Sequence, residues 1–476
     1  MFTNMLLSLL VAVTATAIAE TPPWVVIVAG SNGFQNYRHQ ADACHAYQVA
    51  LANGVPASQI ITMLYDDVAG NEGNPFPGKL YNSVGGSDVY AGCVIDYKGS
   101  ACSMETFFRV LHGNQTAATP RVLGSGAQDN VFIFYTDHGA PGYVTFPAGV
   151  AMHATDLSEA LLTMSQLGKY GKLLFYMDAC NTGSMFGGGL LKAPRALAVA
   201  AALATEESYA AYCPPYDKVA AENGREVFSC LGDVMSLQWM FASSSSSKAA
   251  AADHAGHAAG NETTTATVGS QIDVVANRTA TGHVLNRDHN SHVQAFGDMS
   301  IRDMAVAAFQ GAKAGAKAGA KVGVNVGAEG GGGGGGAAIV AAAAAVPRTS
   351  ARDVALVLAR HKVAVAAPAS RAAAAAAREL ADVLASRARA DRRFSGLGAA
   401  CGQPAWVERA VPQPFLEDRA TVACYKGLLD ATAAAWGAMD DYALRYSGLL
   451  ANLCGERGAA AEQCVRAAVA AADDRE

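Results

Sequence analysis

The chain has 476 residues, a formal net charge of −6 and only 16% charged residues. A mildly acidic balance removes the electrostatic basis for a dedicated nucleic-acid-binding protein, and the length allows two or three domains. The 51% hydrophobic content would suit a membrane protein, but much of it is alanine, which buries little surface per residue.

An apolar stretch, LLSLLVAVTATAIA, occupies residues 6–19 and ends in the small-x-small pattern Ala-Ile-Ala. This pattern predicts a cleaved signal peptide over residues 1–19, with a signal anchor or a soluble N-terminus as alternatives. Ten cysteines and three glycosylation sequons, at Asn114, Asn261 and Asn277, fit the same secretory compartment.

Apolar runs alternate with helical sequence from residue 22 to about residue 204. Strands are predicted at 24–30, 60–65, 131–136 and 172–177, and helices near 39–51 and 150–167. Such alternation favours an open, mostly parallel α/β sheet. Ligands of these sheets bind beyond the carboxyl ends of the strands. Two of those ends carry Asp137-His138-Gly139 and Asp178-Ala179-Cys180.

The composition changes abruptly after residue 240. A low-complexity insert is predicted over about 243–285 and a flexible linker, with an unbroken glycine run at 330–336, over 312–350. His254 and His257 lie in the insert without a further ligand, so we predict no metal site there. The Gly/Ala-rich run at 326–346 contains Glu329 and lacks the strongly apolar residues of a membrane span.

Helical composition returns from residue 351 to the end of the chain. The stretches 354–366, 372–388 and 412–471 all have helical character. Four cysteines accompany them: Cys401, Cys424, Cys454 and Cys464. The simplest interpretation of residues 351–476 is an all-α module tied by up to two disulfides, the alternative being four reduced thiols. Elsewhere, Cys213 with Cys230 and Cys93 with Cys102 are candidate pairs, although sequence alone does not fix the connectivity.

Cys180 is the candidate nucleophile and His138 the candidate base. Thiolate chemistry needs a nearby imidazole to take the sulfur's proton, and both residues follow predicted strands of one sheet. Gly139 allows backbone N–H groups to approach a developing oxyanion, and the Cys180 amide is a second donor. The competing interpretation is a buried core cysteine and a hydrogen-bonded histidine.

Several segments resemble the legumain-type asparaginyl endopeptidases, also called vacuolar processing enzymes. The most specific is NYRHQADACHAYQ at 36–48, a thirteen-residue match. The other similar segments, in the family's order, are YDD at 65–67, DVY at 88–90, FYTDHG at 134–139, DAC with GSMF at 178–186, ESY at 207–209, YCP at 212–214, CLGD at 230–233, SHV at 291–293, FGD at 296–298 and NLC at 452–454.

The resemblance implies a caspase-like cysteine protease domain over residues 20–311, followed by the linker and a helical inhibitory prodomain over 351–476. It implies that Cys180 and His138, with Gly139, are catalytic and that Asn36 orients the histidine. A turn residue is the alternative role for Asn36. No cofactor is implied.

Specificity for asparagine requires a pocket that complements both the carbonyl and the NH2 group of that side chain. Arg38 can donate to the oxygen, and Asp178 or Asp233 can accept from the nitrogen. These positions and Ser208 match the family's S1 pocket, except that the family usually has Glu where this chain has Asp178. When the acids are protonated, an aspartic acid side chain of the substrate becomes isosteric with asparagine, so a weak cleavage after aspartate is expected at acid pH.

Two further properties follow from the resemblance. Ala140, Pro141 and Ala210 stand where the family biases thioester breakdown between hydrolysis and peptide ligation, so a ligase side activity is expected. The prodomain should cap the active site until acid weakens its hold and the enzyme cuts the linker itself. Asn325 is the predicted autocleavage site, with Asp353, Asp382 and Asp391 as fallback sites.

The expected partners are protein and peptide substrates and the chain's own prodomain, with neither nucleic acid nor stable membrane insertion. The expected location is the vacuole, the lysosome or the extracellular space. A GPI-transamidase-like peptidase is one alternative, but its C-terminal membrane helix does not suit residues 447–476, which carry charges throughout. A non-catalytic binding protein with the same fold is the other, against which the intact catalytic residues argue.

Overall fold

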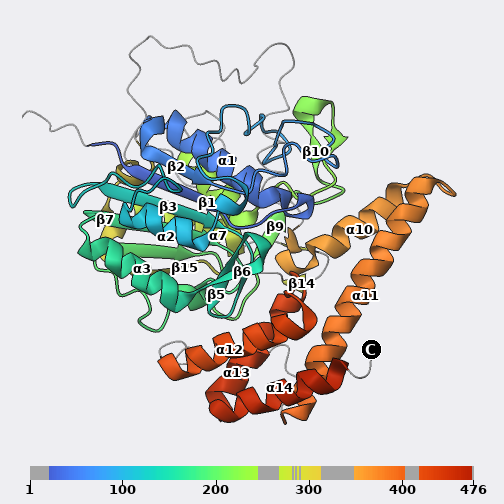
Figure 1. Cartoon of the computed structure of the whole chain (residues 1–476). Coiled ribbons are helices and arrows are strands. Elements are labelled where there is room, and N and C mark those ends of the chain that lie inside the picture. Colours follow the sequence, from blue (N-terminus) through green and yellow to red (C-terminus); the bar gives the residue numbers. More distant parts are fainter. Residues whose placement is uncertain are drawn as a thin grey trace, which may run out of the picture.

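The computed structural model describes residues 21–244, 267–280, 291–311, 348–402 and 418–473, and the backbone of two short strands between 283 and 288. The predicted signal peptide, the candidate autocleavage residue Asn325, the sequon at Asn261, and His254 with His257 lie outside the described residues. Figure 1 shows an α/β domain with a separate group of C-terminal helices against one of its sides.

A six-stranded sheet forms the centre of the α/β domain. Its strands in spatial order are β15 (Gln294–Gly297), β8 (Ala196–Ala200), β7 (Lys172–Asp178), β3 (Asn130–Thr136), β1 (Trp24–Ala29) and β2 (Ile60–Met63). All neighbours pair in parallel except β15, which runs antiparallel to β8. The runs are continuously apolar because helices cover both faces. The prediction of a mostly parallel sheet flanked by helices is confirmed.

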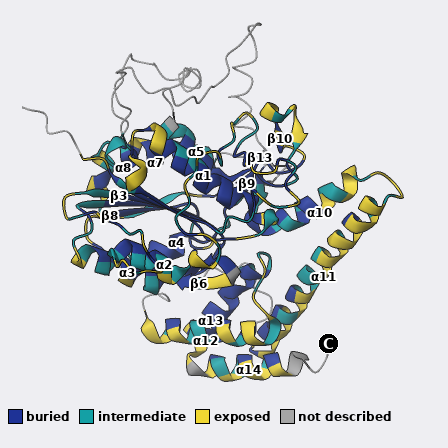
Figure 2. Ribbon diagram, turned by 45° about the horizontal axis from the view of Figure 1, so that its top comes forward, coloured by how far each residue is buried: buried dark blue, intermediate teal, exposed yellow. Residues whose placement is uncertain are grey.

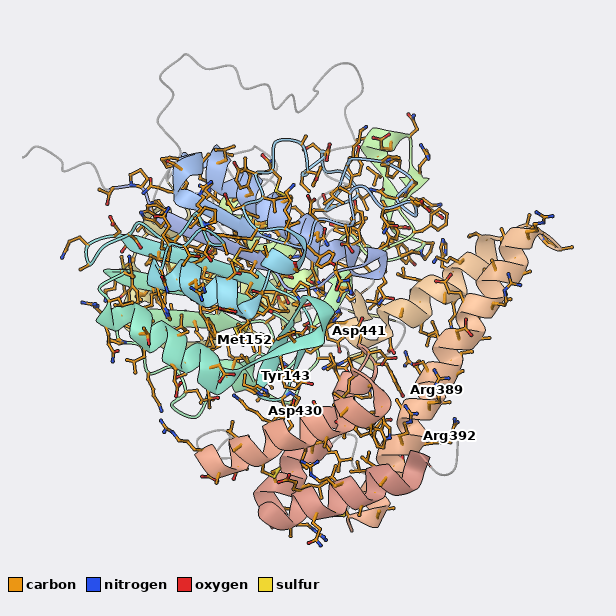
Figure 3. The ribbon with its side chains drawn as sticks, in the orientation of Figure 1. Tyr143, Met152, Arg389, Arg392, Asp430 and Asp441 are labelled. Atoms are coloured by element: carbon orange, nitrogen blue, oxygen red, sulfur yellow. A yellow bond between two sulfur atoms is a disulfide. The ribbon has the colours of Figure 1, made fainter. Side chains whose placement is uncertain are left out.

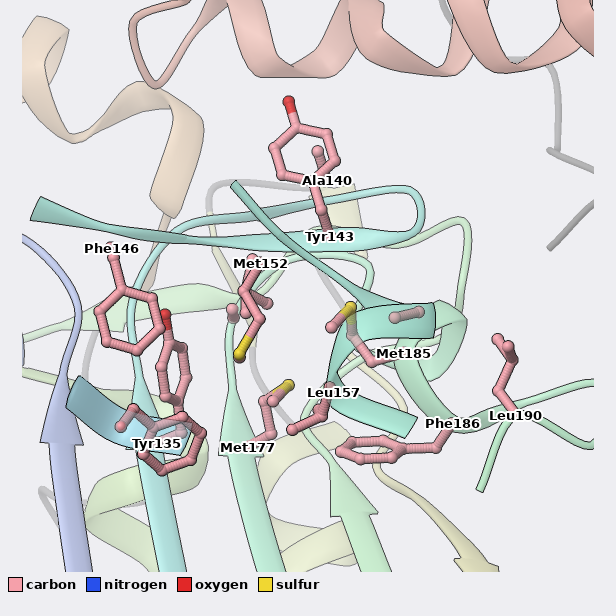
Figure 4. Close-up of a cluster of buried hydrophobic side chains, with 14 of the residues drawn as sticks. Tyr135, Ala140, Tyr143, Phe146, Met152, Leu157, Met177, Met185, Phe186 and Leu190 are labelled. Carbon is pink, nitrogen blue, oxygen red and sulfur yellow. The ribbon is translucent and has the colours of Figure 1, made fainter. Parts of the chain in front are cut away.

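Helices pack on each face of this sheet (Figure 2). One face carries α1 (Tyr37–Ala52), α5 (Val234–Ser244), α7 (Val268–Ala280) and α8 (Ala307–Gln310). The other carries α2 (Met104–His112), α3 (Ala154–Gln166) and α4 (Gly183–Phe186). Figure 4 shows part of this second core, where Met152, Met177 and Met185 pack among aromatic rings.

Two local predictions differ from the structure. Residues 150–153 form strand β6 (Val150–His153), and the predicted helix begins only at Ala154. Within the range predicted as a low-complexity insert, α7 is an ordered helix. Its buried residues Val268, Ile272 and Val275 recur at helical spacing and pack against α5.

Four small sheets complete the domain. Their strands are β4 (Gly139–Ala140), β5 (Tyr143–Phe146) and β6; β9 (Tyr209–Ala211), β12 (Gly232–Asp233) and β16 (Arg348–Ser350); β10 (Lys218–Val219) and β11 (Arg225–Glu226); β13 (His283–Val284) and β14 (Arg287–Asp288). β16 belongs to the predicted linker, yet it pairs antiparallel with β9 of the α/β domain.

The C-terminal region is helical, as predicted. It contains α10 (Val354–Val365), α11 (Arg371–Ala400), α12 (Arg419–Trp436), α13 (Ser447–Arg457) and α14 (Ala459–Asp473). Side chains cap two of these helices, since Ser370 accepts from the Ala373 amide and Asp418 from the Thr421 amide. No helix within the described residues is both long and apolar enough to cross a membrane.

Four disulfides cross-link the chain. The predicted Cys213–Cys230 pair is confirmed, and two disulfides, Cys401–Cys464 and Cys424–Cys454, tie the C-terminal helices, so the reduced-thiol alternative is wrong.

The predicted Cys93–Cys102 pair is also wrong, because Cys93 pairs with Cys44 of α1. Cys102 belongs to the hydrophobic core on the opposite face of the sheet, where it is a free, buried thiol.

Candidate active site

The ends of β3 and β7 bring the candidate nucleophile and base to one place. Thr136 lies opposite Asp178 in the parallel register, and the Asp137 amide donates to the Asp178 carbonyl at 3.1 Å. His138 and Cys180 each lie two residues beyond this pair. Gly139 is required here, because a Cβ at this position would lie 2.2 Å from the Cys180 carbonyl oxygen. The two chain segments therefore run in direct contact.

His138 is held by Asn36 from the 3₁₀ turn η1 (Phe34–Asn36). The Asn36 Oδ1 lies 2.9 Å from His138 Nε2, and the Asn36 amide also donates to the Gly33 carbonyl. Asn36 is therefore both a turn residue and a partner of the imidazole, so the two sequence interpretations hold together. Burial, and then the positive groups nearby, lower the pKa of His138 well below its ordinary range.

Cys180 is 1% exposed and contacts Ser208, whose amide nitrogen lies 3.3 Å and whose Oγ lies 3.7 Å from Sγ. Burial raises the pKa of the Cys180 thiol, although Arg352 opposes the shift. Ser208 thus contacts the candidate nucleophile through both its backbone and its side chain.

A buried charged cluster lies at the same ends of β3 and β7, where Thr136 bonds Asp233 and Asp178 ends β7. Arg38 donates from Nε to Asp233 Oδ1 at 2.8 Å, while its Nη1 and Nη2 find no acceptor among the described residues. Burial alone would raise the pKa of Asp233, but Arg38 and His39 lower it. Both oxygens of Asp233 are engaged, because Oδ2 accepts from Thr136 and lies 3.3 Å from His39. Asp233 therefore holds Arg38 in place.

Asp178 supplies the free acceptor of this cluster. Its Oδ2 accepts from the Ser236 amide at 2.8 Å and from the Ser236 hydroxyl at 2.7 Å, whereas its Oδ1 has no partner among the described residues. Burial and Asp233 raise the pKa of Asp178 to about 7. The cluster thus leaves two donor nitrogens and one acceptor oxygen unsatisfied in a buried setting, where each costs about 1–3 kcal/mol.

Two residues of the C-terminal region, Asp441 and Arg352, lie at this site. The sequence did not predict either of them as a site residue. Asp441 Oδ1 lies 3.1 Å from His138 Nε2, and Figure 3 places Asp441 between the C-terminal helices and the α/β domain. Arg352 is 2% exposed and donates to the Gly139 carbonyl and to Asn181 Oδ1. Neither lies near a catalytic motif in the sequence, so only the tertiary structure reveals them.

The candidate ligation positions line the same edge. Ala140 and Ala210 are fully buried, in β4 and β9, and the Pro141 carbonyl accepts a hydrogen bond from the Tyr425 hydroxyl at 2.9 Å. α12 therefore packs against this edge.

His39, Asp137 and His138 form the single metal-capable group among the described residues, with ligand atoms within 4.8 Å of one another. Ser31 lies 2.6 Å from His39 Nδ1, Thr145 donates to Asp137, and Asn36 contacts His138.

A cysteine and a histidine that follow two neighbouring parallel strands, with an asparagine bonded to the imidazole, are the residue types that cysteine peptidases use. The chain belongs to the Peptidase C13 family, whose sequence profile matches residues 23–312.

Curated relatives agree with this assignment. A "Hemoglobinase" of Schistosoma japonicum is 40% identical over 61% of this chain and 60% of its own length. The "Vacuolar-processing enzyme delta-isozyme" of Arabidopsis thaliana is 43% identical over 47% and 48%, and the "Legumain" of Rattus norvegicus is 40% identical over 65% of each chain. The chain thus spans about half to two thirds of the length of these relatives. Among solved structures, caspase-1 from Spodoptera frugiperda aligns with 62% of this chain and 91% of its own at a TM-score of 0.33 and 9% identity, values from which we infer nothing further.

Proposed function

We propose that this protein is a cysteine endopeptidase that cleaves peptide bonds after asparagine and, more weakly, after aspartate at acid pH. One observation carries the proposal: the buried cluster offers unsatisfied donors on Arg38 and an unsatisfied acceptor on Asp178. A carboxamide is the complement of this set, because its carbonyl accepts and its NH2 donates. A hydrocarbon side chain would leave all of these groups unpaired.

The site residues suggest the following reaction. Cys180 Sγ attacks the carbonyl carbon after asparagine while His138 takes the thiol proton. The amides of Gly139 and Cys180 stabilise the oxyanion. His138 then protonates the departing amine, leaving a thioester. Water, deprotonated by His138, attacks the thioester and releases the peptide acid and the free thiol. An amine in place of water would give the ligase side activity expected from Ala140, Pro141 and Ala210.

Turnover of fluorogenic Ala-Ala-Asn, Ala-Ala-Gln and Ala-Ala-Asp peptides after acid treatment tests this proposal. We expect a strong preference for Asn over Gln, because the additional methylene moves the carboxamide away from Arg38 and Asp178. Such a mismatch in a hydrogen-bonding pocket costs at least about 10²-fold in kcat/KM. Equal turnover of the Asn and Gln peptides would contradict the specificity, and no turnover of any peptide would support the non-catalytic alternative.

We further propose that residues 351–476 are an inhibitory prodomain joined to the protease domain, residues 20–311, by the linker 312–350. Three contacts of α12 and the 3₁₀ turn η9 (Ala443–Tyr446) with the α/β domain support this: Tyr425 with Pro141, Lys426 with Asp156 at 2.7 Å, and Arg445 with Glu207 at 3.2 Å. Asp441 and Arg352 occupy the space at the catalytic residues. A substrate cannot reach Cys180 until this region leaves.

The fallback cleavage sites are poorly presented in this state. Asp353 lies in the 3₁₀ turn η7 (Ala351–Asp353) and pairs with Arg387, and Asp391 accepts from the hydroxyls of Tyr442 and Tyr446. Asp382 lies within α11. Because a peptidase binds extended chain, these helical positions favour Asn325 as the first cleavage site.

Release of the prodomain at acid pH requires a titratable group that binds a proton more readily once the prodomain has left. His153 meets this requirement: burial, and then Lys426 of α12, lower its pKa from 6.5 to about 4 in the docked state. Neutral His153 is compatible with docking above pH 6.5. As the pH falls toward 4, the free energy of prodomain docking weakens by at most about 3 kcal/mol, because the released state takes up a proton more readily. Asp441 has the opposite effect on docking. Burial raises its pKa to about 6, so the docked state takes up a proton more readily than the released state, and acid favours docking. His153 therefore contributes to acid sensitivity, and the lowered pKa of His138 acts in the same direction.

His153→Gln should slow self-activation at pH 5 by about tenfold, because the docked prodomain no longer loses stability as a histidine becomes charged. The measurement is the half-time of conversion to the mature chain by gel or mass spectrometry. His112→Gln, on α2 and bonded only to the Ala160 carbonyl, is the matched control. Unchanged kinetics in His153→Gln would remove His153 from the release mechanism.

We place the protein in the secretory pathway, with the vacuole or lysosome as destination. The apolar N-terminus, the four disulfides and the names of the plant relatives support this location.

A further inference from the structure

Ser236 makes two hydrogen bonds that the proposed reaction does not use. It is the third residue of α5 and is fully buried. The amide nitrogens of a helix's first turn have no helical acceptor, so its backbone N–H is free to bind Asp178 Oδ2 without loss to the helix. The hydroxyl donates to the same oxygen.

These bonds fix the orientation of the Asp178 carboxylate. With Oδ2 held by Ser236, Oδ1 is left as the acceptor without a partner among the described residues. Aspartate has one methylene fewer than glutamate, so its reach depends more strongly on where its carboxylate is anchored. Two donors on one oxygen also stabilise the ionised carboxylate over the neutral acid.

We propose that Ser236 is a positioning residue that controls the charge of Asp178 and thereby sets the pH at which the pocket begins to accept aspartate as well as asparagine. This inference rests on the proposed asparaginyl specificity and assigns its pH dependence to the enzyme rather than to the substrate.

The other charged groups of the cluster leave Asp178 as the one that titrates. Arg38 and Asp233 form an ion pair, and His39 beside them has its pKa lowered to about 4 by burial and Arg38. Burial and Asp233 raise the pKa of Asp42 well above its ordinary range. Asp178 itself has a pKa near 7. Asp441, which also faces Arg38, belongs to the prodomain and is gone from the mature enzyme.

The charge of Asp178 decides which side chain can bind. When ionised, Asp178 accepts from the NH2 group of asparagine and repels an aspartate carboxylate. When protonated, it donates to that carboxylate, while Arg38 binds the other oxygen. Acceptance of aspartate should therefore rise as the pH falls through the pKa of Asp178. A switch governed by the substrate's own carboxyl group would instead lie near pH 4.

The experiment compares kcat/KM for Ala-Ala-Asp and Ala-Ala-Asn peptides from pH 4 to 8 in the activated enzyme. Ser236→Ala removes one donor to the ionised carboxylate, so the midpoint of the Asp-to-Asn ratio should move upward by about one pH unit. Ser236→Thr keeps the hydroxyl and should retain the original midpoint. Ser243→Ala, the same change two turns further along α5, is the matched control and should leave it unchanged.

Asp178→Asn provides a second test that does not depend on the folding of Ser236→Ala. It removes the titrating group, so the Asp-to-Asn ratio should lose its transition between pH 5 and 8. A midpoint near pH 4 in the wild type, or the same midpoint in Ser236→Ala as in the wild type, would overturn the inference while leaving asparaginyl cleavage intact. No cleavage of the Asn peptide by the wild type would overturn both.

Discussion

Cys180→Ala is expected to reduce hydrolysis of an Ala-Ala-Asn peptide by at least about 10⁴-fold. Sγ is the only group at the strand ends that can form the thioester, and neither Ser208 nor water at this site replaces a thiolate. Because maturation is proposed to be autocatalytic, the variant should also stay at full length after acid treatment. Peptide turnover and intact mass measure the two effects.

Cys102→Ala is the matched control, since Cys102 is the other free thiol and is equally buried. It lies in the core beneath the sheet, where its Sγ contacts the Ala29 carbonyl, and burial raises the pKa of its thiol far above the working range. We expect this variant to mature and to cleave at the wild-type rate. Activity that survives in Cys180→Ala but is lost in Cys102→Ala would reverse the assignment of the nucleophile.

The parallel sheet and the placement of His138 and Cys180 could be predicted because they depend on local pattern. Continuous apolar runs such as that of β1 mark buried parallel strands, and such strands place their carboxyl ends at one edge. The same rule explains why two residues far apart in sequence share a site. Family motifs added Arg38, Asp178 and Asn36, which lie close to these ends.

Features that depend on which surfaces pack together could not be predicted. Cys93 is near Cys102 in sequence, but the sheet separates them, and Cys44 becomes the partner because α1 packs on the face where Cys93 lies. Likewise, nothing local marks Asp441 or Arg352 as neighbours of the catalytic histidine and glycine. Their positions follow from the docking of the C-terminal helices, which short-range patterns do not encode.

The different hydrogen bonding of Asp178 and Asp233 is another feature that the sequence could not predict. From sequence, either acid could accept from an asparagine side chain. In the structure Asp233 binds Arg38 and Thr136, whereas one oxygen of Asp178 has no partner among the residues that the structure describes. Hydrogen-bond saturation, which requires coordinates, therefore distinguishes two residues that motif matching treats alike.

Arg38→Gln should lower kcat/KM for asparaginyl peptides by about 10²–10³-fold, the second largest effect that we expect. The substitution removes the two unpartnered nitrogens that would bind the substrate carbonyl and the positive charge that keeps Asp233 ionised. A charge-assisted hydrogen bond contributes about 1.5–3 kcal/mol, and a buried acid without its partner adds a further penalty. Both losses fall on substrate binding and on the stability of the fold, so thermal unfolding must be measured alongside turnover.

Two variants separate these contributions. Arg38→Lys keeps the charge but cannot present a guanidinium fork, so it should recover stability more than asparagine cleavage. Arg121→Gln is the structural control, because Arg121 pairs with Asp96 and with backbone carbonyls far from the site. It should lower the melting temperature without changing the preference for Asn over Gln. Wild-type preference in Arg38→Gln would contradict the role of Arg38, because its free nitrogens are the donors that the pocket offers to the carbonyl.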